Sequence, residues 1–151
     1  MELLNKPILA TEIEWKIQSY TKDKTKTIIV PYITNRCVLD RFDQAFGYGW
    51  QSEFREVEGG FICSISIKVG DEWIKREDAA NRTKIEPLKG GISDSMKRAA
   101  HQWGLGRNLY DYPKVMIKGE VKYLDDKTLQ RLHKMTEAIN DGKFIQKVVI
   151  L

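Results

Sequence analysis

Length, composition and charge fit a globular protein. The chain has 151 residues, enough for one domain with a modest core, and 42% of them are apolar and 30% charged. No apolar run approaches the roughly 20 residues of a membrane span, and the acidic N-terminal segment, broken by Pro7, does not have the pattern of a signal peptide. The net charge of +4 permits nucleic-acid binding but does not establish it.

The first element in the chain is expected to be a helix. Leu9, Ile13, Ile17 and Tyr20 recur at helical spacing, and Pro7 is suited to the first helical position. The periodicity therefore predicts a helix over residues 7–20.

A strand, TIIVPYI, and a second helix, TNRCVLDRFDQAFG, are predicted next. Pro31 in the strand indicates a sheet edge or a bend. Thr34 or Asn35 can cap the helix, and a glycine can end it. The residues expected on the apolar stripe of this helix are Val38, Leu39, Phe42 and Phe46.

Residues 50–80 predict an antiparallel β-meander. Gly59-Gly60 and Gly70-Asp71 supply the turns between three strands. The central strand alternates between apolar and polar side chains, which predicts one dry face and one polar face. The residues expected on the dry face are Phe61, Cys63, Ile65, Ile67 and Val69.

The C-terminal part of the chain predicts two helices and a hairpin. Residues 89–110 have a helical apolar stripe, in which Gly90-Gly91 either allow close approach to another backbone or delay the helix start to Ser93. Residues 114–141 predict a hairpin and a capped final helix, and 142–151 form an apolar tail. The sequence therefore predicts one α+β domain over its whole length, with the meander packed against helices.

The two cysteines, Cys37 and Cys63, do not indicate a metal site or a disulfide framework. They lie among apolar neighbours, form no CxxC pair and have no histidine close in sequence. We expect buried thiols in a reducing compartment, and hence a cytoplasmic protein.

The stretch KGGISDSMKRAAHQWGLGRNLY resembles a phosphate-binding segment of one of two kinds. A nucleotide-binding P-loop requires GxxxxGK followed by Ser or Thr. From Gly91 the chain reads GISDSMKR, so Met96 replaces the second glycine and Arg98 replaces the hydroxyl. We therefore exclude an ATP site and expect no cofactor.

No group of residues has a spacing that suits catalysis. Glu77 and Asp78 could hold a metal for a nuclease, but adjacent residues on a strand point to opposite faces. A solvated or salt-bridged pair beside Arg76 is the simpler interpretation. His101 and His133 have no partner at zinc spacing, and no serine lies in a GxSxG elbow.

The second kind of phosphate is a nucleic-acid backbone. Lys97 and Arg98 project from the helix face opposite the apolar stripe, His101 lies one turn beyond Lys97, and Arg107 follows the helix end. Tyr48, in FGYGW, is an aromatic residue suited to base stacking. The alternative is that the basic pair is only the solvated side of an amphipathic helix and that the aromatic residues belong to the core.

An ordered set of motifs resembles the Rad52 family of single-strand annealing proteins, especially its bacteriophage Sak-type members. The set consists of FGYGWQSEF, a β-meander, KREDAANR and SDSMKRAAHQWGLGRNLYDYP, within residues 34–113. The resemblance implies binding of single-stranded DNA and annealing of complementary strands without ATP. It also implies assembly into rings or open helical arcs, in which a groove holds the phosphate backbone and leaves the bases exposed.

The resemblance also assigns residues to that groove. Lys97 and Arg98 match its basic pair, and Tyr48 matches the aromatic residue of its FGY motif. Arg36 falls within one position of a groove arginine.

Two further groups of basic positions are matched less directly. His101 stands where eukaryotic members carry an arginine, so this phosphate contact requires either Arg107 or a protonated His101. Arg82 and Lys84 lie where members have basic residues near an outer DNA site.

The sequence therefore predicts a non-enzymatic, ATP-independent annealing protein of recombination and repair, encoded by a phage and acting in the cytoplasm of the bacterial host. Its expected partners are single-stranded DNA, further copies of the chain and a host or phage single-strand binding protein. Two alternatives stay open: a Mg²⁺-dependent nuclease acting on recombination intermediates, and a passive single-strand coat protein that slows pairing.

Overall fold

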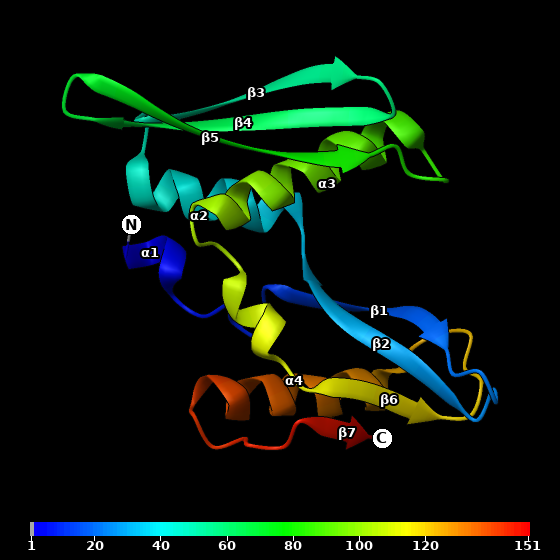
Figure 1. Cartoon of the computed structure of the whole chain (residues 1–151). Coiled ribbons are helices and arrows are strands. Elements are labelled where there is room, and N and C mark those ends of the chain that lie inside the picture. The colour runs from blue at the N-terminus through cyan, green and yellow to red at the C-terminus, as the bar shows by residue number, and fades with distance from the viewer. Residues whose placement is uncertain (1) are drawn as a thin grey trace. The chain divides into compact units, whose positions relative to one another are not determined.

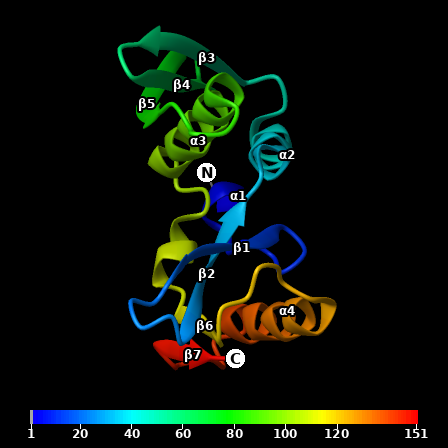
Figure 2. The ribbon, with the colours of Figure 1, turned by 90° about the vertical axis from the view of Figure 1, so that its right-hand side faces the viewer.

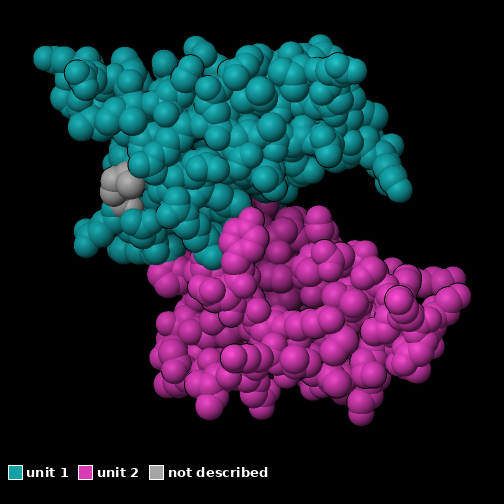
Figure 3. Space-filling model, viewed as in Figure 1, with its two compact units in different colours: residues 1–6, 34–107 teal, residues 7–33, 108–151 magenta. Residues whose placement is uncertain are grey.

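A computed structural model describes residues 2–151 as two compact units (Figures 1 and 3). Unit 1 comprises residues 1–6 and 34–107, and unit 2 comprises residues 7–33 and 108–151. Each unit combines a mainly antiparallel sheet with helices, so the predicted α+β class is confirmed. Within the described residues, no helix has both the length and the apolar character needed to cross a membrane.

Unit 1 is built on a three-stranded antiparallel sheet in the order β3-β4-β5 (Figure 1). Each strand pairs with the next along the chain, which confirms the predicted meander. The strands are β3 (Trp50–Val57), β4 (Gly60–Val69) and β5 (Glu72–Asn81). The helices are α1 (Glu2–Asn5), α2 (Asn35–Phe46) and α3 (Pro87–Gln102), followed by the 3₁₀ turn η1 (Arg107–Asp111), whose first residue belongs to this unit.

The central strand β4 contributes much of the core of unit 1. The four alternating residues from Phe61 to Ile67 that were predicted for the dry face are at most 3% exposed, whereas Val69 at the strand end is 54% exposed. The other face is not solvated at its centre, because Ser64 and Ser66 are also buried. A central strand is covered by side chains from both neighbours, which alternation along one strand does not reveal.

Helix α2 has the predicted caps but a different apolar stripe. Val38 and Phe42 are fully buried as expected, but the prediction for Leu39 is wrong, since it is 43% exposed. Arg41 is buried instead, and its Nη1 donates a hydrogen bond to the carbonyl oxygen of Leu3 (2.9 Å). A long arginine side chain can bury its stem while its guanidinium satisfies backbone carbonyls of α1.

Unit 2 is a four-stranded sheet in the order β1-β2-β6-β7 with α4 on one face (Figure 2). Leu132 and Met135 of α4 form a buried cluster with Ile29 of β2 and Val115 of β6. The strands β1, β2 and β6 pair antiparallel, and β7, from the apolar tail, runs parallel to β6. The elements are β1 (Ile13–Tyr20), β2 (Lys26–Ile33), β6 (Lys114–Lys118), α4 (Asp126–Asn140) and β7 (Val148–Ile150).

The helix predicted over residues 7–20 is wrong, because Ile13–Tyr20 form strand β1. Trp15 and Ile17 pack against the buried cluster, and Ile13 is 8% exposed. Ile13, Trp15 and Ile17 occur at every second position, as in a strand. Ile13 and Ile17 also fit a helical spacing, which is why a helix was predicted. Pairing with β2 decides between the two periodicities.

The hairpin predicted at the start of 114–141 is also wrong. Strand β6 ends at Lys118 and pairs with β2 on one side and β7 on the other, not with the segment that follows it. Both partners are separated from β6 by a helix in the sequence, so a local turn signal could not identify them. The β2–β6 ladder ends at Ile29, so Pro31 has a strand neighbour only in β1, as suits a residue without an N–H.

Candidate nucleic-acid interface

Helix α3 packs closely on β4 and β5 through small side chains. It begins at Pro87, so Gly90 and Gly91 lie inside the helix and the delayed start at Ser93 is wrong. A Cβ atom on Gly91 would lie 2.6 Å from the ring of Phe61, which explains the need for glycine at this position. The buried residues of α3 are Gly91, Ser95, Met96, Ala99 and Ala100.

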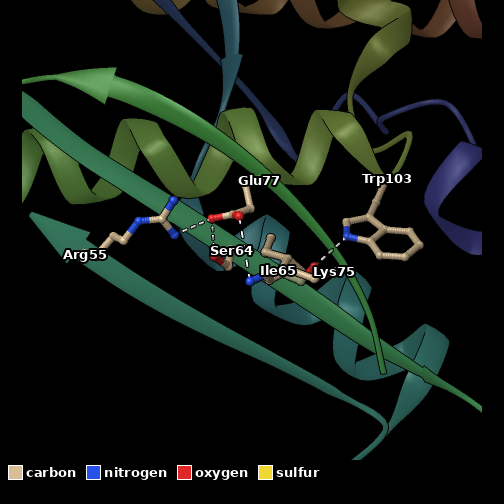
Figure 4. A network of polar contacts seen from close by, with 6 residues as sticks. All are labelled: Arg55, Ser64, Ile65, Lys75, Glu77 and Trp103. Atoms are coloured by element: carbon tan, nitrogen blue, oxygen red, sulfur yellow. Dashed lines mark hydrogen bonds and ion pairs between the residues drawn. The ribbon is translucent and has the colours of Figure 1, made fainter. Parts of the chain in front are cut away.

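The residue that follows α3 anchors it to the sheet. Nε1 of buried Trp103 donates a hydrogen bond to the backbone carbonyl of Ile65 in β4 (3.0 Å; Figure 4). The guanidinium of Arg76, on β5, lies 4.3 Å from the centroid of the Trp103 ring, which is cation–π geometry. The C-terminal end of α3 is therefore held against the strands that flank it.

Two arginines satisfy the last carbonyls of α3. Nε of Arg107 donates to the carbonyl oxygen of His101 (2.7 Å), and its Nη2 donates to that of Gln102 (2.8 Å). Nη1 of Arg76 also donates to the Gln102 carbonyl (2.7 Å). These bonds fill acceptors that a helix end leaves open, and the two charges oppose the negative end of the helix dipole.

His101 is half-buried, and its Nδ1 is within hydrogen-bond distance of the Leu105 carbonyl oxygen. Burial lowers the pKa of His101, the hydrogen bond to Leu105 raises it in part, and the charges of Arg98 and Arg107 lower it further. At neutral pH the imidazole is therefore neutral and donates Nδ1–H to Leu105. The expected phosphate contact from His101 or Arg107 stays a prediction, and both side chains already contribute to the structure of the helix end.

Lys97 and Arg98 lie on the side of α3 away from its buried stripe. The Arg98 side chain is 55% exposed, and its Nε lies 3.4 Å from Oδ1 of Asp78 on β5. The Lys97 side chain is 23% exposed, and its Nζ lies 3.5 Å from Oδ1 of Asp94, three residues earlier. Each cation is thus oriented by a carboxylate at the edge of ion-pair distance.

Asp78 is the residue that connects β5 to the basic helix. Its Oδ2 accepts a hydrogen bond from Nε2 of Gln102 (3.1 Å), and Oδ1 accepts one from the Ala79 N–H (2.7 Å). Partial burial raises the pKa of Asp78, but the Gln102 and Ala79 hydrogen bonds and the Arg98 charge together lower it below its usual value. Asp78 is therefore an anion at neutral pH that positions Arg98.

Glu77 faces the other way, as the strand alternation predicted. Its carboxylate accepts hydrogen bonds from Ser64 (2.7 Å) and Arg55, and Lys75 lies 3.8 Å away (Figure 4). The hydrogen bond from Ser64, which has the larger effect, and that from Arg55 lower the pKa of Glu77. Glu77 and Asp78 thus belong to separate ion-pair networks, and the described residues contain no group of three metal-ligating side chains.

The predicted residues at the start of α2 and in the turn that follows it are exposed. Arg36 lies in the first turn of the helix, and Tyr48, in the turn before β3, is fully exposed. Tyr48 is therefore not part of the core. Trp50 is partly buried: its ring centroid lies 5.1 Å from that of the core residue Phe42, and its Nε1 donates to Asp43 (2.8 Å).

Arg82 and Lys84 lie at the opposite end of α3 from Arg107. The guanidinium of Arg82 lies 4.8 Å from the centroid of the Phe61 ring and pairs with the carboxylate of Glu56. Lys84 is exposed in the loop between β5 and α3.

Contacts in the structure join only some of the predicted site residues. Arg98 and Arg107 lie along one seam between β5 and α3, which Asp78 and Gln102 hold together. Arg76 belongs to the same seam but was not among the predicted site residues. The sequence contains a signal for it, since Arg76 and Asp78 are two apart on a strand and so share a face. Of the remaining predicted residues, Lys97 and His101 lie on α3, Arg36 lies on α2, and Tyr48, Arg82 and Lys84 lie in loops of unit 1.

Comparison with known proteins gives matches of two kinds. Residues 1–128 match the model of the Rad52/22 family of double-strand break repair proteins. The single-stranded DNA-binding protein DdrA of Deinococcus radiodurans is 31% identical over 113 residues, which are 74% of this chain and 54% of that protein. DdrA of Deinococcus deserti is 33% identical over 116 residues, 76% of this chain and 58% of that protein. The chain spans little more than half the length of these relatives, and no solved structure matches significantly.

Proposed function

This chain belongs to the Rad52/22 family of double-strand break repair proteins, and on that basis we propose that it binds single-stranded DNA and anneals complementary strands without ATP. The printed name of the two DdrA relatives supports the first half of this proposal. The narrower expectation of a bacteriophage Sak-type member stays a prediction.

The observation that carries the proposal is the adjacent pair Lys97 and Arg98 on a rigidly seated helix. The pair lies outside the buried stripe of α3, and each side chain is held near one carboxylate. A phosphate can replace these long ion-pair contacts, since charge-assisted hydrogen bonds to phosphate are shorter and stronger. Arg36, His101, Arg107, Arg82 and Lys84 are proposed as further phosphate contacts, and Tyr48 as a stacking platform.

The mechanism needs only physical steps. Two polyanionic strands repel each other, and cations that neutralise one backbone lower that repulsion while releasing counterions. Bases left exposed can then sample a second strand, and duplex formation supplies the free energy. The chain acts in this account as a binding protein and not as an enzyme.

Assembly of several copies would multiply the weak contacts of one site. The sheet of unit 1 has β3 and β5 as its outer strands, and exposed strand edges favour pairing with another chain unless they are covered. We propose a ring or open helical arc of identical subunits, and a single-strand binding protein as an additional partner. Particle images with and without DNA test the assembly, and a uniform monomer at working concentration contradicts it.

A labelled oligonucleotide incubated with the chain and Mg²⁺, without ATP, separates binding from cleavage. The proposal predicts a shift in fluorescence anisotropy with a strand that stays intact on a denaturing gel. Shortened strands, and loss of the shortening in Asp78→Ala, would establish the nuclease alternative instead.

A further inference from the structure

Two arginines from distant parts of the chain meet at the C-terminal end of α3. Nη1 of Arg76, on β5, and Nη2 of Arg107, on η1, donate to the same backbone carbonyl oxygen, that of Gln102, over 2.7 and 2.8 Å. The two guanidiniums therefore converge on one point of the surface. The family resemblance made Arg107 a candidate for a phosphate contact but gave Arg76 no role.

This arrangement supplies more donors than the helix end needs. Backbone groups already cap the last turn: the Gly104 N–H donates to the His101 carbonyl (3.0 Å). The Trp103 N–H likewise donates to the Ala100 carbonyl (3.0 Å). Gln102 is exposed, so water can satisfy its carbonyl oxygen, yet this oxygen accepts one hydrogen bond from each arginine and so uses both of its lone pairs. Capping alone does not account for two cations here.

The two guanidiniums are not neutralised within the fold. Among the described residues, no carboxylate oxygen lies within ion-pair distance of Arg76 or Arg107, and both residues are exposed. Burial first, and then the charges of Arg98 and Arg107, lower the pKa of His101, as expected where positive charges crowd around one ring. The end of α3 therefore keeps an excess of positive charge at a defined position.

Stacking fixes the orientation of the Arg76 guanidinium. It lies 4.3 Å from the centroid of the Trp103 ring, which is buried and bonded to β4. Within the described chain, the bond to Gln102 is the one hydrogen bond that this guanidinium makes. A planar group held in this way presents its remaining N–H donors in a fixed fork, which matches the oxygens of a phosphate group.

Gln102 also connects the two arginines to Arg98. Its Nε2 donates to Oδ2 of Asp78 (3.1 Å), and Oδ1 of Asp78 lies 3.4 Å from Nε of Arg98. Three arginines thus gather around Gln102, with one carboxylate among them. Arg98 and Gln102 are four residues apart on α3, about 6 Å along its axis, which one or two nucleotide steps of a strand can span. Cations at this spacing can contact nearby phosphates of one strand.

We propose that Arg76 and Arg107 form an arginine clamp that grips one phosphate group of the strand held by Lys97 and Arg98, so that Arg76 is a DNA-contacting residue of the α3 site. The clamp supplies the contact expected from His101, whose neutral imidazole is bonded within the fold. A phosphate seated on the outer edges of both guanidiniums would also relieve the repulsion between them. This inference rests on the proposed function, because it extends the same site.

A salt titration of single-strand binding tests whether Arg76 contacts phosphate. Binding of a labelled oligothymidylate, which cannot pair with itself, is measured by fluorescence anisotropy at several salt concentrations. Four proteins are compared: the unchanged chain, Arg76→Gln, Arg76→Lys and the control Lys75→Gln. Lys75 precedes Arg76 on β5, is exposed, and points to the opposite face of the sheet. Urea unfolding measures the stability of each protein.

Arg76→Gln should bind about tenfold more weakly than the unchanged chain. It should also reduce the slope of log K against log salt by about 0.7, the value for one phosphate contact of a single strand. Arg76→Lys keeps the charge but loses the planar fork, so the slope should stay the same while affinity falls about threefold. Lys75→Gln should change affinity less than about twofold and leave the slope unchanged.

An unchanged slope in Arg76→Gln would overturn the proposal, because a residue that only caps α3 does not alter the number of phosphate contacts. Equal losses in Arg76→Gln and Lys75→Gln would overturn it too, since general attraction then accounts for both. If Arg76→Gln does not fold, Arg76→Lys decides: a loss of affinity at constant slope supports the clamp, and unchanged affinity overturns it.

The same titration separates the clamp from the proposed function. If the unchanged chain binds no oligothymidylate, the proposed function fails, and the clamp fails with it. If the unchanged chain binds and Arg76→Gln binds equally well at every salt concentration, the proposed function stands and the clamp alone is wrong.

Discussion

Unit 1 and unit 2 use lysine and arginine in opposite ways. In unit 1 three arginines lie at ion-pair distance from a carboxylate: Arg55 pairs with Glu77, Arg82 with Glu56, and Arg98 with Asp78. In unit 2, at one end of the sheet, no carboxylate oxygen of the described residues lies within ion-pair distance of Lys22, Lys24, Lys26, Lys118 or Lys122, although the charge of Lys26 helps to lower the pKa of Asp23. Nearby carboxylates nearly cancel the charge of the cations in unit 1, whereas unit 2 has three more basic than acidic residues and so contributes most of the net charge of +4.

This difference separates two contributions to DNA binding that composition alone merges. Positioned cations fix the register of a phosphate backbone, and an uncompensated patch attracts a polyanion at a distance. A net charge of +4 spread evenly over the surface would predict neither a fixed register of the backbone nor a local patch that attracts it. The following predictions test this contrast between the cations of the two units, and failure of any one of them would count against it.

The largest effect is expected from Lys97→Ala with Arg98→Ala. Loss of two charge-assisted contacts, at about 1.5 kcal/mol or more each, should weaken single-strand binding by over a hundredfold. The unfolding free energy should change by less than about 1 kcal/mol, because both side chains lie outside the buried stripe of α3, although Lys97 is only 23% exposed. Fluorescence anisotropy and urea unfolding measure the two quantities.

Lys68→Ala with Lys89→Ala is the matched control, since both lysines are exposed in unit 1 and lie outside the proposed site. It removes the same charge and should reduce affinity only a few-fold. If both pairs weaken binding equally, general attraction and not position accounts for it.

Gly91→Ala should destabilise unit 1 by about 1–3 kcal/mol, because the added methyl group would meet the ring of Phe61. DNA binding by the remaining folded protein should stay unchanged. Urea unfolding measures the loss, with Lys89→Ala as the control at an exposed position of the same helix. A rise in stability, as helix propensity alone would give, would refute the close seating of α3.

Tyr48→Ala should weaken single-strand binding by about 1 kcal/mol, roughly fivefold, if the ring stacks on a base. Stability should not change, because the side chain is fully exposed. Tyr48→Phe keeps the ring and should bind normally. Equal loss in both variants would point to the hydroxyl instead.

Asp78→Asn should have the smallest effect and a characteristic pH dependence. The pKa of Asp78 is lowered in the folded state, so its charge stabilises the fold above the unfolded pKa, and this stability is lost as the pH falls through the folded value. The variant should therefore lose under about 1 kcal/mol at pH 7 and nothing in strong acid. Release of Arg98 should raise DNA affinity about twofold; lower affinity would mean that Asp78 orients Arg98 productively.

The meander and the capped helices were predictable because their signals are local. Alternation from Phe61 to Ile67, the Thr34 cap and the Asp125 cap each involve residues close in sequence. That Lys97 and Arg98 lie outside the buried stripe of α3 was predictable for the same reason, while their role in DNA binding stays a prediction.

Unit 2 was predicted poorly because its contacts are distant in sequence. Strand β1 carries both a helical and an alternating pattern, and only pairing with β2 selects the strand. The sequence did not predict that Lys26 and Lys118 lie side by side, because they become neighbours only through the β2–β6 ladder. Within the α3 seam, Arg76 was missed although its spacing from Asp78 placed both on one face.

The rate of pairing between complementary labelled strands, without ATP, tests the central claim most directly. The account predicts that the chain accelerates pairing, that Lys97→Ala/Arg98→Ala abolishes the acceleration, and that Lys68→Ala/Lys89→Ala largely keeps it. Binding that slows pairing would show a passive coat protein, and acceleration that survives loss of Lys97 and Arg98 would contradict the site.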